Sequence, residues 1–136
     1  MKTRRQFIAT VAAGVLSLGV GAAWAAKPTV EIIAMVHPPV QDVLKPLRAW
    51  LANQKGNLRV VEIDAESAQG EKRLVSVGLN GHVPIAILID GTYRFRRKDG
   101  SAVAFFNFPD IKGSPPGVRG DWLTADVQTV LIERMK

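Results

Sequence analysis

One apolar run, Pro84-Ile85-Ala86-Ile87-Leu88-Ile89, sets the tightest limit on how this chain can fold. Proline is tolerated at the first position of a strand but hardly inside one. The residues that follow it leave no polar face, which is typical of a strand that is buried on both sides. The run therefore predicts a central strand, and the rest of the chain must cover both of its faces.

Segments on either side of this run predict an alternation of strands and helices. The runs that predict strands are residues 30–36, 58–63, 84–89, 92–97 and 102–108. The segments that predict helices are residues 40–51, 71–79 and 123–135. Strands that alternate with helices pair in parallel, and a hairpin at Asp90-Gly91 adds antiparallel edge strands. The prediction is a single three-layer α/β domain over residues 26–136.

Several details of this prediction concern where elements begin and end. Pro38-Pro39 is expected to stop the first strand, and the Pro- and Gly-rich segment 109–120 is expected to be a loop. Pro46 falls inside the first helix, where proline removes a backbone hydrogen bond. We expect Asp121 or Thr124 to cap the last helix, because their side-chain oxygens can accept a hydrogen bond from its first N–H groups.

Residues 1–25 are typical of an export signal. Lys2, Arg4 and Arg5 precede an apolar run rich in Ala and Gly, and Ala23-Trp24-Ala25 is a small-x-small cleavage motif. An uncleaved anchor is the alternative, but the run is short of the roughly 20 strongly apolar residues of a spanning helix. Thr3-Arg4-Arg5-Gln6-Phe7-Ile8 resembles the bacterial twin-arginine motif. The resemblance implies export to the periplasm in a folded state, often with a cofactor or a bound partner.

Charge and cysteine content exclude several classes of function. Removal of the three basic residues of the leader lowers the formal net charge from +6 to +3, so we do not expect nucleic-acid binding, which needs a concentrated basic face. The chain has no cysteine. A disulfide, a thiolate metal site and a thiol nucleophile are therefore all impossible.

A resemblance to the thioredoxin superfamily rests on one segment, the element order and Pro46. The segment is Val77-Gly78-Leu79-Asn80-Gly81-His82-Val83-Pro84-Ile85-Ala86-Ile87-Leu88-Ile89-Asp90-Gly91. It is similar to that family's helix end, Val-Pro with a cis bond, apolar strand and Asp-Gly turn, and Pro46 is similar to its helix-kinking proline. The resemblance implies a thioredoxin-like β-α-β-α-β-β-α fold with an extra edge strand or hairpin.

The redox chemistry of that family cannot occur in this chain. Counted back from Pro46, the two cysteines of the family's Cys-x-x-Cys motif would fall at Pro38 and Gln41. Neither residue can attack a disulfide, so thiol-disulfide oxidoreductase activity is excluded. The chain is therefore expected to be a redox-inactive member and not an enzyme.

The resemblance still implies a binding site, because the residue before the proline presents its backbone to an extended peptide that adds as a strand. The expected partner-binding residues are His37, Pro38, Pro39, His82, Val83 and Pro84. The expected function is a non-catalytic periplasmic module that binds a partner protein or extended peptide, as an accessory or assembly subunit of a larger exported system. The simpler interpretation is that Pro84 only begins a strand and makes its loop rigid.

A metal site is the alternative function. His37 and His82 lie in the two loops that meet at one end of the sheet in the family fold, and Met35 is two residues before His37. Imidazole and thioether ligands suit copper, and imidazole also suits zinc. Two histidines underfill the usual three or four ligands, so the competing interpretation is two loop histidines and a core methionine. A hydrolase or isomerase that uses the same groove is a third option.

A basic cluster follows the Asp90-Gly91 turn. Alternation along the predicted strand places Arg94, Arg96 and Lys98 on one face and turns Tyr93 and Phe95 to the core. Such a face can dock an acidic partner or phospholipid head groups, which would bring the protein into peripheral contact with a membrane. A solvated face that discourages pairing at the sheet edge is the competing interpretation.

Overall fold

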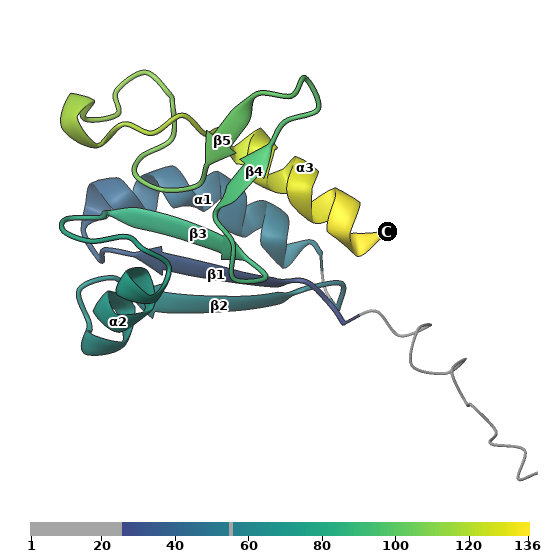
Figure 1. The fold of residues 1–136 in the computed structure, drawn as a ribbon, viewed down its shortest axis with the longest axis horizontal. Coiled ribbons are helices and arrows are strands. Elements are labelled where there is room, and N and C mark those ends of the chain that lie inside the picture. The colour runs from purple at the N-terminus through teal and green to yellow at the C-terminus, as the bar shows by residue number, and fades with distance from the viewer. Residues whose placement is uncertain (1–25, 55) are drawn as a thin grey trace, which may run out of the picture.

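A three-stranded mixed sheet lies at the centre of the computed structural model, which describes residues 26–54 and 56–136 (Figure 1). Its strands are β1 (Thr29–Ala34), β2 (Arg59–Asp64) and β3 (Ile85–Ile89), in the order β2-β1-β3. β1 and β2 are parallel, as predicted, whereas β3 runs antiparallel to β1. β1 and β2 therefore end at the edge of the sheet where β3 begins.

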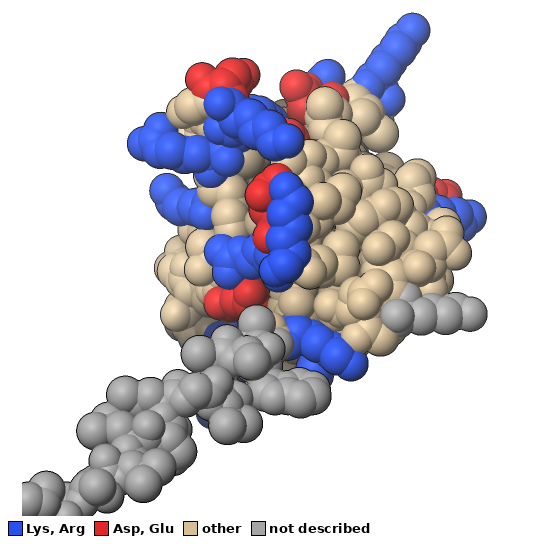
Figure 2. All heavy atoms as spheres, turned by 90° about the vertical axis from the view of Figure 1, so that its right-hand side faces the viewer, with Lys and Arg blue, Asp and Glu red and all other residues tan. Residues whose placement is uncertain are grey.

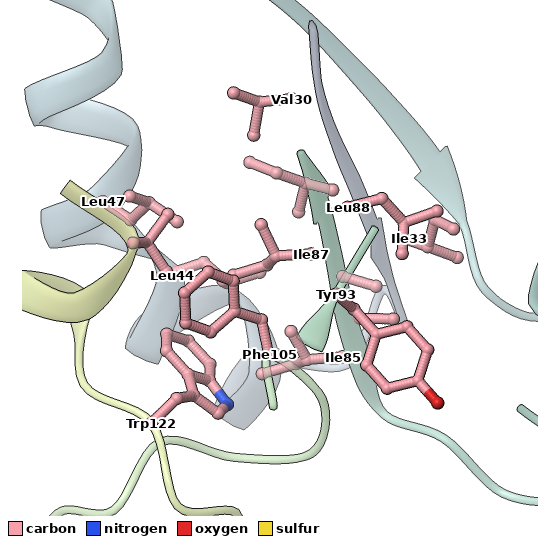
Figure 3. Packing of buried hydrophobic residues seen from close by; sticks show 14 of the residues in the cluster. Val30, Ile33, Leu44, Leu47, Ile85, Ile87, Leu88, Tyr93, Phe105 and Trp122 are labelled. Carbon is pink, nitrogen blue, oxygen red and sulfur yellow. The ribbon is translucent and has the colours of Figure 1, made fainter. Parts of the chain in front are cut away.

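Helices cover both faces of this sheet and give the predicted three layers. They are α1 (Pro38–Ala52), α2 (Ala68–Ser76) and α3 (Thr124–Met135). Figure 3 shows Leu44 and Leu47 of α1 packed on one side of β1 and β3, with Ile33 on the other side. α2 lies on that second side, where Arg73 donates hydrogen bonds to Glu31 of β1. The chain is thus a mixed α/β protein with three helices in its described part.

The predicted burial of this strand is confirmed, but its predicted central place is not, because β1 is the middle strand of the three-stranded sheet and β3 lies at its edge. All five residues of β3 are buried, with 0% of each exposed. Ile32 of β1 lies opposite Ile87, and the backbone N–H of Ile87 donates on the other side to the carbonyl of Phe105 at 2.8 Å. β3 therefore has a hydrogen-bonded neighbour along each of its edges as well as side chains against each face.

A short hairpin of β4 (Arg94–Arg96) and β5 (Ala102–Ala104) follows β3. The predicted turn is present, with positive φ angles of 50° at Asp90 and 81° at Gly91. Such angles favour Asp and Gly, which is why this dipeptide indicates the turn from the sequence alone. A single 3₁₀ turn, Pro116–Val118, interrupts the predicted loop 109–120.

Several predicted element ends are wrong. The strand predicted at 102–108 ends at Ala104, and the helix predicted at 71–79 spans Ala68–Ser76. Pro38-Pro39 does not stop the first strand but begins α1. In the first turn of a helix the backbone N–H groups have no partner within the helix, so proline, which lacks an N–H, costs no hydrogen bond there, and its fixed φ suits a helix. Neither Asp121 nor Thr124 caps α3. Asp121 instead accepts a hydrogen bond from the backbone N–H of Ala104, and Asp126 in the first turn accepts one from the backbone N–H of Leu123.

The predicted export signal, residues 1–25, lies outside the described residues. In the described part of the chain, no helix has the length and apolar character needed to cross a membrane.

Gly70 fixes the position of α2 against the end of β2. A Cβ at this position would overlap the carbonyl oxygen of Asp64 and lie 2.9 Å from Cα of Ala65. We expect Gly70→Ala to lower the free energy of unfolding by about 1–3 kcal/mol, because the backbone must move to accept the methyl group. Denaturant unfolding followed by circular dichroism measures this change.

Gly117→Ala is the matched control, since a Cβ at Gly117 meets nothing within 4 Å. Its stability should stay within about 0.5 kcal/mol of the wild type. Equal stability of the Gly70→Ala variant and the wild type would show that α2 is not held at this distance from β2.

Candidate functional site

A hollow of about 520 Å³ lies where β1 and β2 end and β3 begins, beside α2. Figure 1 shows these strand ends at the left-hand edge of the sheet, with α2 next to them. The apolar side chains that line the hollow are Met35, Ala65, Leu74, Val75, Leu79 and Val83. The polar side chains that line it are Glu66, Glu71, Asn80 and His82.

Local hydrogen bonds hold the segment that joins β2 to α2. The carboxylate of Asp64 accepts from the backbone N–H of Glu66 at 2.9 Å, and the hydroxyl of Ser67 caps α2 by accepting from the N–H of Gly70 at 3.0 Å. Arg73 then ties α2 to β1 by donating to both carboxylate oxygens of Glu31, at 2.9 and 2.7 Å. These contacts set the positions of Glu66 and Glu71 at the rim of the hollow.

A second set of hydrogen bonds holds the segment that joins β1 to α1. The backbone N–H of Met35 donates to the carbonyl of Pro84 at 2.9 Å. The side chain of Gln41 donates to the carbonyl of Met35 at 2.7 Å and accepts from Arg48 at 2.9 Å, and Arg48 also pairs with Glu62. Met35 is thus fixed from both sides, and its side chain forms part of the hollow.

The two histidines take different positions at this site. Nε2 of His37 lies 2.7 Å from Oε1 of Glu66, with both side chains more than half exposed. His82 lines the hollow together with Glu66. Among residues 26–54 and 56–136, no group of three or more His, Asp and Glu side chains is arranged to hold a metal ion. The described residues therefore add no further His, Asp or Glu ligands to the copper or zinc site predicted at His37, His82 and Met35.

The predicted partner-binding residues are brought to this edge of the sheet but only in part to the hollow. His82 and Val83 line the hollow, and His37 contacts Glu66, which lies at its rim. Pro38 and Pro39 are exposed at the start of α1, and Pro84 is buried behind Val83. The cis bond that the resemblance implies at Val83–Pro84 is wrong, because no peptide bond in the described residues is cis. The Pro84 carbonyl instead extends the β1–β3 pairing as the acceptor for Met35.

The chain matches no protein-family model, no curated protein and no solved structure.

Sequence reasoning did not assign Glu66, Glu71 or Val75 to the site. Two patterns in the sequence point to them. Glu66 lies three residues after the predicted strand 58–63, where the chain leaves the sheet. Glu71 and Val75 are four residues apart, a spacing that places side chains on one face of a helix.

The basic cluster does not form a single patch. Arg94, Arg96 and Lys98 are exposed as predicted, but Arg94 lies beside Tyr93, with its Cζ 5.3 Å from the ring centroid. Arg96 and Lys98 line a separate hollow of about 320 Å³ against α3. Figure 2 faces the end of the molecule that carries the β4–β5 turn and the end of α3, and it shows Lys and Arg side chains with carboxylates between them.

Arg97 has a structural role within this cluster. It donates to both carboxylate oxygens of Asp126 at 2.9 Å and to the carbonyl of Asp121 at 2.6 Å. Burial raises the pKa of Asp126, but the hydrogen bonds from Arg97 and from the Leu123 N–H outweigh burial and hold this pKa below its ordinary value. The ion pair therefore joins the hairpin to the first turn of α3.

The lowered pKa of Asp126 makes the stability of the fold depend on pH in the acid range. The ionised carboxylate stabilises the fold at neutral pH, and this contribution is lost as the pH falls through the folded-state pKa. We expect Asp126→Asn to lower the free energy of unfolding by about 1–3 kcal/mol at pH 7. The difference from wild type should shrink below pH 3.8, the ordinary pKa of the group. Denaturant unfolding at pH 7 and near pH 2.5 measures both effects.

Asp110→Asn is the control for this prediction. Asp110 pairs with Arg119 at 2.8 Å, but both side chains are about half exposed. Exposed pairs contribute about 0–1 kcal/mol, so this variant should stay close to the wild type at both pH values. A pH-independent loss in Asp126→Asn would contradict a role for the ionised carboxylate.

Proposed function

We propose that this chain is a non-catalytic module with a thioredoxin-like fold that binds an extended segment of a partner protein in the periplasm. The hollow at the ends of β1 and β2 is the proposed binding site. Residues 1–25 are the proposed twin-arginine export signal, and the proposed role is an accessory or assembly subunit of a larger exported system. Thiol exchange is not part of this function, because the chain has no cysteine.

The observation that carries this proposal is the position of Val83 beside the hollow. Val83 as a whole residue is 5% exposed and lines the hollow, while its backbone N–H and carbonyl make no hydrogen bond within the described residues. Unpaired backbone groups favour a partner that can satisfy them. An extended peptide can pair with such a residue through its main chain and place a side chain in the adjacent hollow.

Two further observations favour a protein partner at this edge. Val36 and Val75 are 66% and 60% exposed. Val75 lines the hollow, and Val36 follows Met35, which also lines it. Apolar side chains beside an unpaired backbone segment provide the mixed contact that peptide binding uses, with the main chain giving affinity and the side-chain pocket giving specificity.

The strand arrangement supports the thioredoxin-like part of the proposal. A βαβ unit with parallel strands is followed by an antiparallel β3 and a hairpin, and α1 and α3 lie on the face opposite α2. Pro46 lies inside α1 and Pro84 precedes β3, which are the positions that the resemblance gives the two prolines, although the Val83–Pro84 bond is not cis.

Replacement of Val75 by asparagine tests the site. Peptides selected by the full chain from a displayed heptapeptide library should perturb NMR signals of Met35, Leu79 and Val83. Val75→Asn should weaken binding of a selected peptide about 10-fold or more, since it removes an apolar contact worth about 1.5–3 kcal/mol and leaves the charge of the hollow unchanged. Titration by NMR gives the dissociation constants.

Val60→Asn is the matched control, because Val60 is another exposed valine that lies on β2 and does not line the hollow. It should bind the same peptide within about twofold of the wild type. If the selected peptides instead perturb the hollow beside Arg96 and Lys98, the binding site has been placed on the wrong face.

A further inference from the structure

The hollow beside Val83 has a charge opposite to that of the protein around it. Residues 26–136 carry a formal net charge of +3. Within this hollow, however, the charged lining side chains are Glu66 and Glu71, and none of the described residues that line it is Lys or Arg. A negatively charged ligand group would be repelled from this site, whereas a cationic group would be attracted.

The walls below these carboxylates are apolar. Met35, Leu74, Leu79 and Val83 are each less than 10% exposed and line the hollow, while Glu66 and Glu71 are exposed at its rim. A volume of about 520 Å³ lies within the roughly 300–1,000 Å³ typical of small-molecule pockets. Lysine and arginine side chains combine an apolar stem with a charged head, which is the chemistry that such a site complements.

We propose that the hollow takes the side chain of a lysine or arginine from the extended segment of the partner. The stem packs on Met35, Leu74 and Val83, and the ammonium or guanidinium group donates hydrogen bonds to Glu66 and Glu71. This inference rests on the proposed function, since it assigns the residue type that the peptide site selects.

Glu66 and Glu71 are both available to such a cation. Glu66 contacts His37, but the two side chains are 53% and 62% exposed, and exposed ion pairs contribute little. An incoming lysine or arginine can therefore replace His37 at Glu66 at low cost. Glu71 forms no ion pair within residues 26–54 and 56–136. It lies in the first turn of α2, where its negative charge also stabilises the helix through the helix dipole. The experiment must separate these two roles of Glu71.

Four pools of fluorescein-labelled, capped heptapeptides test the proposal on the full chain. Their central residue is lysine, arginine, norleucine or glutamate, and the other positions are random among Ala, Val, Leu, Ser and Thr. Fluorescence polarisation at low ionic strength should show the lysine and arginine pools binding about 10-fold or more tightly than the norleucine pool, because hydrogen bonds to charged groups are the stronger ones. The glutamate pool should bind weakest.

The double variant Glu66→Gln, Glu71→Gln should bring the cationic pools to the affinity of the norleucine pool. If the double variant only destabilised α2 through loss of the Glu71 charge, it would weaken binding of all four pools equally. Unchanged binding of the norleucine pool would therefore show that α2 is intact. Glu133→Gln on α3 is the control, since it removes an exposed carboxylate that does not line this hollow. It should leave the preference for lysine unchanged.

Three results would overturn the inference. Equal binding of the lysine and norleucine pools, with Val75→Asn still weakening both, would rule out a preference for a cation and leave the peptide site in place. Binding of free cadaverine as tight as that of the lysine pool would exclude an extended peptide as the occupant. Absence of binding by every pool would contradict the proposed function itself.

Discussion

The rest of the structure depends on the pairing of β1 with β3. Ile32 and Ile33 of β1 and Ile87 and Leu88 of β3 are completely buried, and these side chains point to both faces of the sheet. Because β3 has no polar face and Thr29 and Glu31 are the polar residues of β1, water must be excluded from most of both sides of the pair. α1 and α3 do this on one face and α2 on the other, so the layers follow from the composition of two short strands.

The direction of β3 places the candidate site. Since β3 runs antiparallel to β1, its first residues lie beside the last residues of β1 and β2. The segments that join β1 to α1, β2 to α2 and α2 to β3 therefore meet at one edge of the sheet, and α2 forms the fourth side of the hollow. The Met35 to Pro84 hydrogen bond closes the pair at this edge. Beyond it the chain leaves the ladder at Val83, and the backbone groups of Val83 have no hydrogen-bond partner among the described residues.

Much of the fold could be predicted because the deciding signals are local. Five apolar residues in β3 and an Asp-Gly turn each constrain the backbone directly, whatever lies around them. The errors arose where one residue type has two uses: proline after a strand either ends it or begins a helix, as Pro38 does. The site was predicted less fully, because the histidines lie in the expected loops but Glu66 and Glu71 become neighbours of His82 only through the packing of α2 on β2. Gly70 and Arg73 set that packing, and neither residue carries a functional pattern in the sequence.

The distribution of charge along the molecule bears on how a partner would approach. Arg134 pairs with Asp90, and Asp90 accepts from the backbone N–H of Thr29, so these groups lie where β1 begins and β3 ends. Arg96 and Lys98 share a hollow with Arg134 at that end, whereas Glu66 and Glu71 lie where β1 ends. At the hairpin end the cations alternate with the carboxylates of Asp99, Asp126 and Glu133, whereas the hollow at the other end has carboxylates and no Lys or Arg among its described lining residues. Such a difference in local charge steers a charged group before contact, so the cationic peptide proposed above would be attracted to the hollow more than to the hairpin end. Because Glu66 and Glu71 are exposed, salt screens this attraction over about 10 Å at 0.1 M ionic strength, while the apolar contact with Val75 and Val83 is unaffected by that screening.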